Sequence, residues 1–295
     1  MDLPEAPLSA VTLISPNVDD GFGSALAQHQ GSLWIGAPHG LQGSVYRWDE
    51  ESLTEVLQGS GRLGSHLAGT STSLWAAAPL AAKVVDQNGD TVAEGDSGTG
   101  IALSATGHIA SASGWMAPDG ATGTSPGRPT AIHQDGDALS IGMAHGPVAL
   151  TAGGQDWARP EASDEAGFSL SDGIIDGQAA WLVGAPAANK VYGLSQADLT
   201  IVRIWDGTGR FGHAITVADV DGDSTPDLVV GAPLAGDRGE VRVFTSMGSA
   251  SQPLTLDSAE IRQAGTALLA GEQRLFIGAP GDVETPGAVL MVPLP

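Results

Sequence analysis

Short apolar runs recur along this chain, and most of them are preceded by a turn and followed by Gly-Ala-Pro or a close variant. The most complete copy reads FGHAITVADVDGDSTPDLVVGAP, from Phe211 to Pro233. Four copies match it closely, and two weaker ones keep the apolar runs and the turn but lack the Phe and the Pro. The close copies run from Gly21 to Pro38, Arg62 to Pro79, Gly167 to Pro186 and Gln263 to Pro280, and the weaker ones from Thr99 to Ser113 and Ile141 to Gly153. The chain is therefore a series of seven like units.

Each unit has the pattern of short β-strands. An apolar run such as Leu33-Trp34-Ile35 lies between a turn and Gly-Ala-Pro, and proline ends a strand because it has no N–H for the sheet. A further strand-like run follows in most units, for example Gly43 to Trp48, Lys190 to Leu194, Glu240 to Phe244 and Ala288 to Val292. The units begin about every 40 residues, a period typical of four-stranded propeller blades. No stretch shows a sustained apolar period near 3.6, so we expect very little helix.

The Phe-Gly start and the Gly-Ala-Pro end, with an aspartate-rich loop between them, resemble FG-GAP repeats. These are the units of the integrin alpha-subunit propeller and of related bacterial surface proteins. The resemblance covers essentially the whole chain and implies an all-β fold, with residues 1–295 as one domain. That domain would be a seven-bladed β-propeller of four-stranded antiparallel blades. We expect the N-terminal segment, Ser9 to Ser15, to complete the last blade as its outer strand, because the chain ends after what would be that blade's third strand.

Five residues of the Phe211 unit have the spacing of a calcium-binding loop. They are Asp219, Asp221, Asp223, Thr225 and Asp227, at positions 1, 3, 5, 7 and 9 of the loop. Alternate residues of a tight loop can converge on one centre, and the four carboxylates would repel one another without a cation. Carboxylate and carbonyl oxygens suit Ca²⁺, which takes about 6–8 such ligands in flexible geometry. We therefore predict a structural calcium ion here, and the resemblance implies that the loop joins the first two strands of its blade.

The other units lack this set of ligands. Only Asp172 and Asp176 remain in the unit that begins at Gly167. A second, weak calcium site near these two carboxylates stays open as an alternative.

Charge and composition narrow the classes of partner. The chain has 34 acidic and 12 basic residues, a net charge of -22, which disfavours binding to nucleic acid or anionic lipid. It has no cysteine, so disulfides and thiolate metal sites are excluded. No apolar run is long enough to span a bilayer, and the first five residues lack the features of a signal peptide. Because relatives of the FG-GAP type are mostly secreted, the resemblance implies an extracellular or cell-surface location.

The sequence shows no acid/base constellation, so we expect no enzymatic activity. The resemblance favours a non-enzymatic module for protein–protein interaction or cell adhesion, monomeric as an isolated domain, with an unknown protein ligand or glycan. Trp34 and Trp75 occupy equivalent positions before Gly-Ala-Pro and are expected to pack between blades. Trp115 and Trp157 are expected in long loops, which leaves a lectin that stacks sugars on these tryptophans as an alternative. A hydrolase or lyase built on a propeller is the third alternative.

Overall fold

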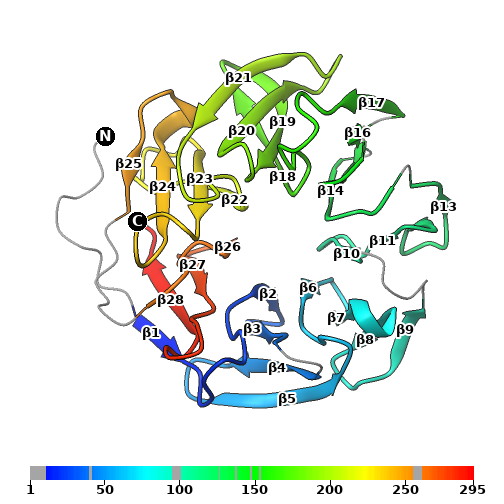
Figure 1. Ribbon diagram of the computed structural model, residues 1–295, viewed down its shortest axis with the longest axis vertical. Helices are drawn as coiled ribbons and strands as arrows, with labels where there is room; N and C mark the ends of the chain where they lie inside the picture. Colours follow the sequence, from blue (N-terminus) through cyan, green and yellow to red (C-terminus); the bar gives the residue numbers. More distant parts are fainter. Residues whose placement is uncertain are drawn as a thin grey trace.

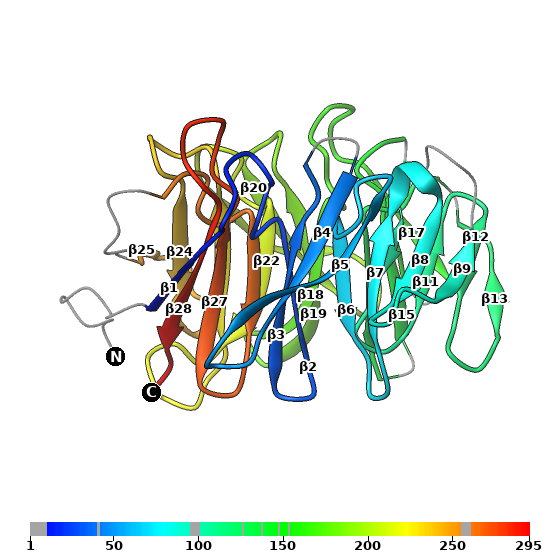
Figure 2. The same cartoon turned by 90° about the horizontal axis from the view of Figure 1, so that it is seen from below.

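The computed structural model describes residues 11–39, 42–94, 101–125, 127–136, 138–146, 148–152, 154–254 and 261–295. Seven sheets of four strands each stand around a common axis as a ring (Figure 1). Seen from the side, the strands run between the two faces of the ring, and the loops lie on both faces (Figure 2). Neighbouring strands within each sheet are antiparallel. The predicted seven-bladed propeller of four-stranded antiparallel blades is therefore confirmed.

The strands of each blade follow one another from the axis of the ring outward (Figure 1). Blades one to three comprise β2 (Ala25–His29), β3 (Ser32–Ala37), β4 (Gln42–Trp48) and β5 (Leu53–Ser60), then β6 (His66–Gly69), β7 (Leu74–Ala78), β8 (Lys83–Asp86) and β9 (Thr91–Glu94), then β10 (Ala102–Leu103), β11 (Ile109–Ser111), β12 (Gly114–Met116) and β13 (Thr122–Gly123). Blades four and five comprise β14 (Ala131–Asp135), β15 (Ala138–Gly142), β16 (Val148–Ala152) and β17 (Gln155–Ala158), then β18 (Ser169–Ile175), β19 (Gln178–Ala185), β20 (Lys190–Ser195) and β21 (Ile201–Asp206). Blades six and seven comprise β22 (Ala214–Ala218), β23 (Asp227–Ala232), β24 (Glu240–Phe244) and β25 (Gln252–Pro253), then β26 (Ala267–Ala270), β27 (Arg274–Ala279), β28 (Ala288–Pro293) and β1 (Val11–Ile14).

Helical structure is confined to two short 3₁₀ turns in the described part of the chain. They are η1 (Pro79–Ala81) and η2 (Thr245–Met247). This agrees with the absence of a helical period in the sequence. Among the same residues, no helix has the length and apolar character needed to cross a membrane.

The N-terminal strand closes the ring, as predicted. β1 pairs antiparallel with β28, with Val11 opposite Met291 and Ile14 opposite Ala288. The backbone N–H of Ser15 extends the pairing by donating to the Gly287 carbonyl at 2.8 Å. Ser9 and Ala10, the first residues of the predicted strand, lie outside the described residues. Blade seven is thus assembled from an N-terminal and a C-terminal part of the chain, and β1 lies beside β28 (Figure 1).

The apolar core is divided among the joints between neighbouring blades. Seven clusters of buried side chains each combine residues of two adjacent sheets. The largest fully buried side chains include Trp181, Trp205, Phe22 and Phe211. Trp34 is buried in the joint between blades one and two, and Trp75 packs, partly buried, in the next joint. The expectation that Trp34 and Trp75 pack between blades is therefore confirmed.

The Gly-Ala-Pro and Phe-Gly signatures meet at the joints. Gly231, in the Gly-Ala-Pro of blade six, lies against Gly265 at the start of blade seven, and a methyl group on Gly231 would overlap the Gly265 carbonyl oxygen. Gly265 itself has a φ of 87°, in the left-handed region that favours glycine. The same contact recurs at the glycine pairs Gly36–Gly64, Gly142–Gly167, Gly184–Gly212 and Gly278–Gly23. Glycine is required at these positions because the backbones of neighbouring blades touch there.

The fourth unit begins earlier than the sequence pattern predicted. Its first strand is β14, so Ile141 and Gly142 end the second strand, β15, instead of starting the first. The prediction was wrong because the pattern it relied on, a small residue beside an apolar run, occurs both at the start of a blade's first strand and at the end of its second. The true start, Thr130-Ala131-Ile132, has no Phe-Gly before it to mark the register.

Candidate metal centre

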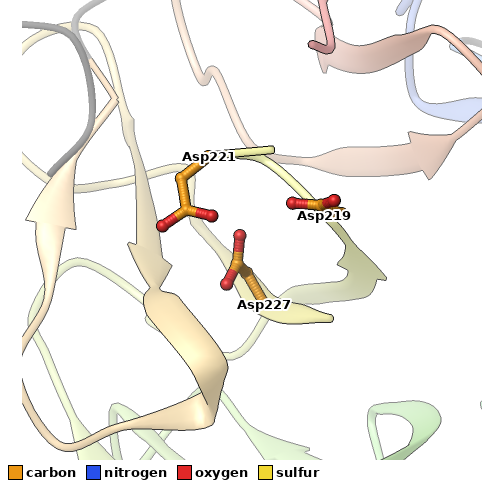
Figure 3. A group of neighbouring side chains, drawn as sticks. All are labelled: Asp219, Asp221 and Asp227. Carbon is orange, nitrogen blue, oxygen red and sulfur yellow. The ribbon is translucent and has the colours of Figure 1, made fainter. Parts of the chain in front are cut away.

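Three aspartates meet at the hairpin that joins the two inner strands of blade six. β22 and β23 are paired up to Ala218 opposite Asp227, and residues 219–226 connect them. Asp219, Asp221 and Asp227 each place one carboxylate oxygen within 4.8 Å of those of the other two (Figure 3). The loop therefore joins strands one and two of its blade, as the resemblance implied, and its carboxylates form a group that can hold a metal ion.

Backbone N–H groups of the loop hold the carboxylates in place. Asp219 accepts a hydrogen bond from Gly222 N at one oxygen and from Ser224 N at the other, both at 2.8 Å. Asp221 accepts one from Asp223 N at 3.1 Å. Gly222 has a φ of 78°, which a residue without a side chain adopts without strain. The turn is thus wrapped around its own aspartates.

Asp227 ties the loop to the outer half of the blade. Its side chain is fully buried, with one oxygen accepting from Val220 N and the other from Ser246 N in η2, both at 2.8 Å. Burial raises the pKa of the Asp227 carboxyl, the two backbone N–H groups lower it, and Asp221 and Asp223 raise it again. The carboxylate is therefore held in a place where a negative charge is costly unless a cation lies beside it.

Asp223 and Thr225, the other two predicted ligands, lie outside this group of three. Both are exposed, and the Asp223 carboxylate accepts a hydrogen bond from Thr225 N at 2.7 Å. The structure thus brings together three of the five residues, and the part of Asp223 and Thr225 in coordination stays a prediction. The contact between Asp227 and Ser246 was not foreseen, because no local pattern announces a bond between residues on different hairpins.

The carboxylates proposed for a second, weak site already have cationic or donor partners. Asp172 lies 2.7 Å from Nε2 of His133, and this bond lowers the pKa of Asp172. Asp176 lies 2.7 Å from the Arg203 guanidinium. Among the described residues, neither belongs to a group of three ligands within reach of one ion. The structure therefore gives the weaker site no support.

The two tryptophans expected in loops lie in strands instead, and that expectation was wrong. Trp115 is in β12, with its indole packed over the backbone at Gly123. Trp157 is in β17, with its ring 5.3 Å from that of Tyr192 in an edge-to-face contact. The residues around Trp115 look irregular in sequence because the strands of blade three have only two or three residues. Neither tryptophan is the free loop platform on which the lectin alternative rested.

Comparison with known families supports the interpretation of the repeat. Residues 211–244, which contain the three aspartates, match the family model of the FG-GAP repeat. No curated protein sequence matches the chain. An FG-GAP repeat is thus present in blade six.

Several solved structures share the fold at low sequence identity. A streptogramin B lyase has a TM-score of 0.72 and 15% identity, covering 97% of this chain and 98% of that one. An inactive variant of virginiamycin B lyase from Staphylococcus aureus, solved with quinupristin, has a TM-score of 0.71 and 13% identity, covering 97% and 99%. A chain of a mitotic checkpoint complex has a TM-score of 0.64 and 11% identity, covering 100% and 98%. At these identities the likeness concerns the fold alone.

Proposed function

We propose that this chain is a calcium-binding propeller that acts as a non-enzymatic module for protein–protein interaction or cell adhesion outside the cytoplasm. The observation that carries the proposal is the group formed by Asp219, Asp221 and Asp227 at the inner hairpin of blade six. A purely structural turn has no need of three converging carboxylates, since each one raises the cost of charging the others.

Calcium fits the donor set better than other common divalent ions. The group offers only oxygen, without the histidine or cysteine that zinc favours. Asp223 and the carbonyl of Thr225 lie in the same loop and would bring the ligand number toward the 6–8 oxygens that Ca²⁺ takes. A bound ion would supply positive charge beside the buried Asp227, where burial has raised the pKa of the carboxyl.

The role of the ion would be structural. Asp227 connects the loop to Ser246 in η2, the turn that follows β24, so an ion on Asp227 would fix both hairpins of the sheet. Binding to the folded state alone stabilises a protein by about 2.7 kcal/mol when the free ion is at 100 times its dissociation constant. The occupancy of the site can therefore be measured through the stability of the folded protein.

Thermal unfolding in calcium and in EDTA tests the metal. We expect calcium to raise the Tm of the wild type, and Asp221→Asn to abolish the difference while leaving the Tm in EDTA almost unchanged. Asp237→Asn is the matched control, because Asp237 is exposed in another loop of the same blade and should preserve the response. Equal melting of the wild type in calcium and in EDTA would refute a structural calcium site.

The interaction role needs a separate test. The net charge of -22 favours a basic protein surface over nucleic acid or anionic lipid as the partner. Affinity capture from extracellular fluid in calcium, with the Asp221→Asn variant alongside, should recover a ligand. A glycan array should show no binding that depends on Trp115 or Trp157, and quinupristin should not be turned over. Turnover would contradict the non-enzymatic proposal, and glycan binding lost in Trp115→Ala or Trp157→Ala would favour the lectin.

A further inference from the structure

A cavity of ≈ 640 Å³ lies on the axis of the ring, bounded by the innermost strands of all seven blades. This volume is in the range of small-molecule sites. The second residue of every inner strand is a leucine or an isoleucine, from Leu26 in β2 to Leu268 in β26, and all seven line this cavity. We call these seven side chains the apolar belt. The belt gives the cavity a continuous apolar wall, although the ring as a whole is strongly acidic.

Most of the hydroxyl groups beside the belt are already engaged with the backbone. Ser24, Ser65 and Thr266 line the cavity, and each donates its hydroxyl proton to a carbonyl of the preceding turn, at 2.7, 2.7 and 2.8 Å. His213 donates through Nδ1 to the Thr266 carbonyl at 3.1 Å. These groups therefore have few hydrogen-bond donors left to offer a ligand.

Two lining residues differ from these groups. His66 has an Nδ1 without a hydrogen-bond partner among the described residues, and Arg62 carries a full charge. It is the one charged side chain among the described residues that line the cavity. Arg62 is an exposed residue, and its Nε donates a long hydrogen bond of 3.4 Å to the carbonyl of Pro38, another lining residue, so the guanidinium lies beside the cavity wall. No carboxylate among the described residues pairs with it, whereas Arg159, Arg203 and Arg210 each have an acidic partner.

Without a carboxylate partner in the described part of the chain, the guanidinium of Arg62 keeps its charge available to a ligand. The free N–H groups of an arginine form a planar fork that matches a carboxylate with two parallel hydrogen bonds. A site with an apolar wall next to a guanidinium can bind both ends of one amphipathic molecule, the apolar end on the wall and the anionic end on the arginine.

We propose that the axial cavity binds a small organic carboxylate with an apolar tail, its head group on Arg62 and its tail against the apolar belt. The negative field of the whole molecule opposes the approach of any anion, but it is largely screened beyond about 8 Å at physiological ionic strength. The site is distinct from the aspartate loop, since none of the three aspartates lines the cavity.

Isothermal titration with three probes of equal chain length tests the head group. Octanoate, octanol and octylammonium differ in charge but share the tail. We expect octanoate to bind at least 10-fold more tightly than octanol and octylammonium, equally in calcium and in EDTA. Failure of octanoate to bind at millimolar concentration, or binding of octylammonium as tight as that of octanoate, would overturn the proposal. Loss of binding in EDTA would contradict the independence of the two sites.

Variants locate the two ends of the ligand. Arg62→Gln should weaken octanoate at least 10-fold and leave octanol unchanged, whereas Arg238→Gln, at an exposed arginine outside the cavity, should change neither. Ala131→Phe fills the cavity wall and should abolish the binding of both probes, whereas Ala197→Phe in an exposed turn should not. If Arg62→Gln does not fold, Arg62→Lys decides, with an expected loss of several-fold because lysine cannot form the paired contact. Unchanged octanoate affinity in the folded Arg62 variant would overturn the proposal.

Discussion

His66 and His213 lie at the inner strands of blades two and six and are uncharged at neutral pH. Burial lowers the pKa of His66 to about 4. The pKa of His213 is also lowered to about 4, by burial first and by the nearby Arg210 second, against a smaller opposing effect of the Thr266 carbonyl. Both histidines line the axial cavity, so their neutrality leaves Arg62 as the cation of its wall.

These two histidines predict a loss of stability in mild acid. The unfolded chain binds their protons below about pH 6.5, whereas the folded ring binds them only near pH 4. The unfolded state therefore gains protons first, and the free energy of unfolding falls as the pH drops from 6.5 to 4. Each histidine contributes up to about 3 kcal/mol over this window.

Urea unfolding at a series of pH values in EDTA measures this loss. We expect His66→Gln to flatten the slope between pH 6.5 and 5, and His145→Gln, at an exposed histidine, to leave it unchanged. A wild-type stability that does not change across this range would show that the histidines are not protected from protonation.

At the residue scale, the aspartates that meet were predictable because a loop of alternating carboxylates within one hairpin is a local pattern. The second contact of Asp227 was not, because Ser246 reaches it from the end of β24. The axial placement of Arg62 was equally hidden. Arg62 lies beside the axial cavity only because all seven blades close into a ring, and no local sequence pattern predicts which side chains face the axis.

At the element scale, the joint between blades depends on the pair of glycines. The carbonyl of one glycine occupies the space that a side chain on the other would need, as at Gly231 and Gly265. The Gly-Ala-Pro motif is therefore a packing requirement between blades as well as the end of a strand.

Gly231→Ala should be markedly destabilising. Its methyl group would overlap backbone of blade seven, which cannot rotate away as a side chain can, and overpacking of this kind costs about 1–3 kcal/mol or more. Gly127→Ala is the control, since Gly127 has no positive φ and a methyl group there would make only ordinary contacts. Urea unfolding measures both changes. Equal stability of the two variants would mean that the blades shift apart at little cost.

Strand patterns in the sequence located most elements, because proline and glycine mark both ends of the inner hairpin in five units. They failed where the marks are missing. In blade four the predicted first strand was in fact the second. In blade three the strands around Trp115 were too short to give a recognisable pattern. In both places the position of the strands is set by the neighbouring blades.

At the scale of the whole molecule, the ring is closed by four residues of β1. Leu13 packs against the apolar cluster between blades seven and one, while Val11 and Ile14 are largely exposed. Removing β1 would uncover both this cluster and the hydrogen-bonding edge of β28.

Deleting residues 1–14 should lower the free energy of unfolding by at least about 2 kcal/mol, the low end of the cost of removing a packed leucine. It should also cause self-association, because an uncovered strand edge can pair with another chain. Denaturant unfolding and analytical ultracentrifugation measure the two effects. The double variant Val11→Thr, Ile14→Thr keeps the pairing and should behave as the wild type. A truncated chain that stays monomeric and equally stable would show that β1 is dispensable.

Blade three differs from the rest of the ring in a way that concerns how the ring fails. Its strands have two or three residues each, and among the described glycines neither of its joints shows the close backbone contact found at five others. At the joint with blade two, Ala77 stands in the glycine's place and packs with Ile101. Because a closed ring opens first where its joints are weakest, we expect local unfolding to begin at blade three, across the ring from the pairing of β1 with β28.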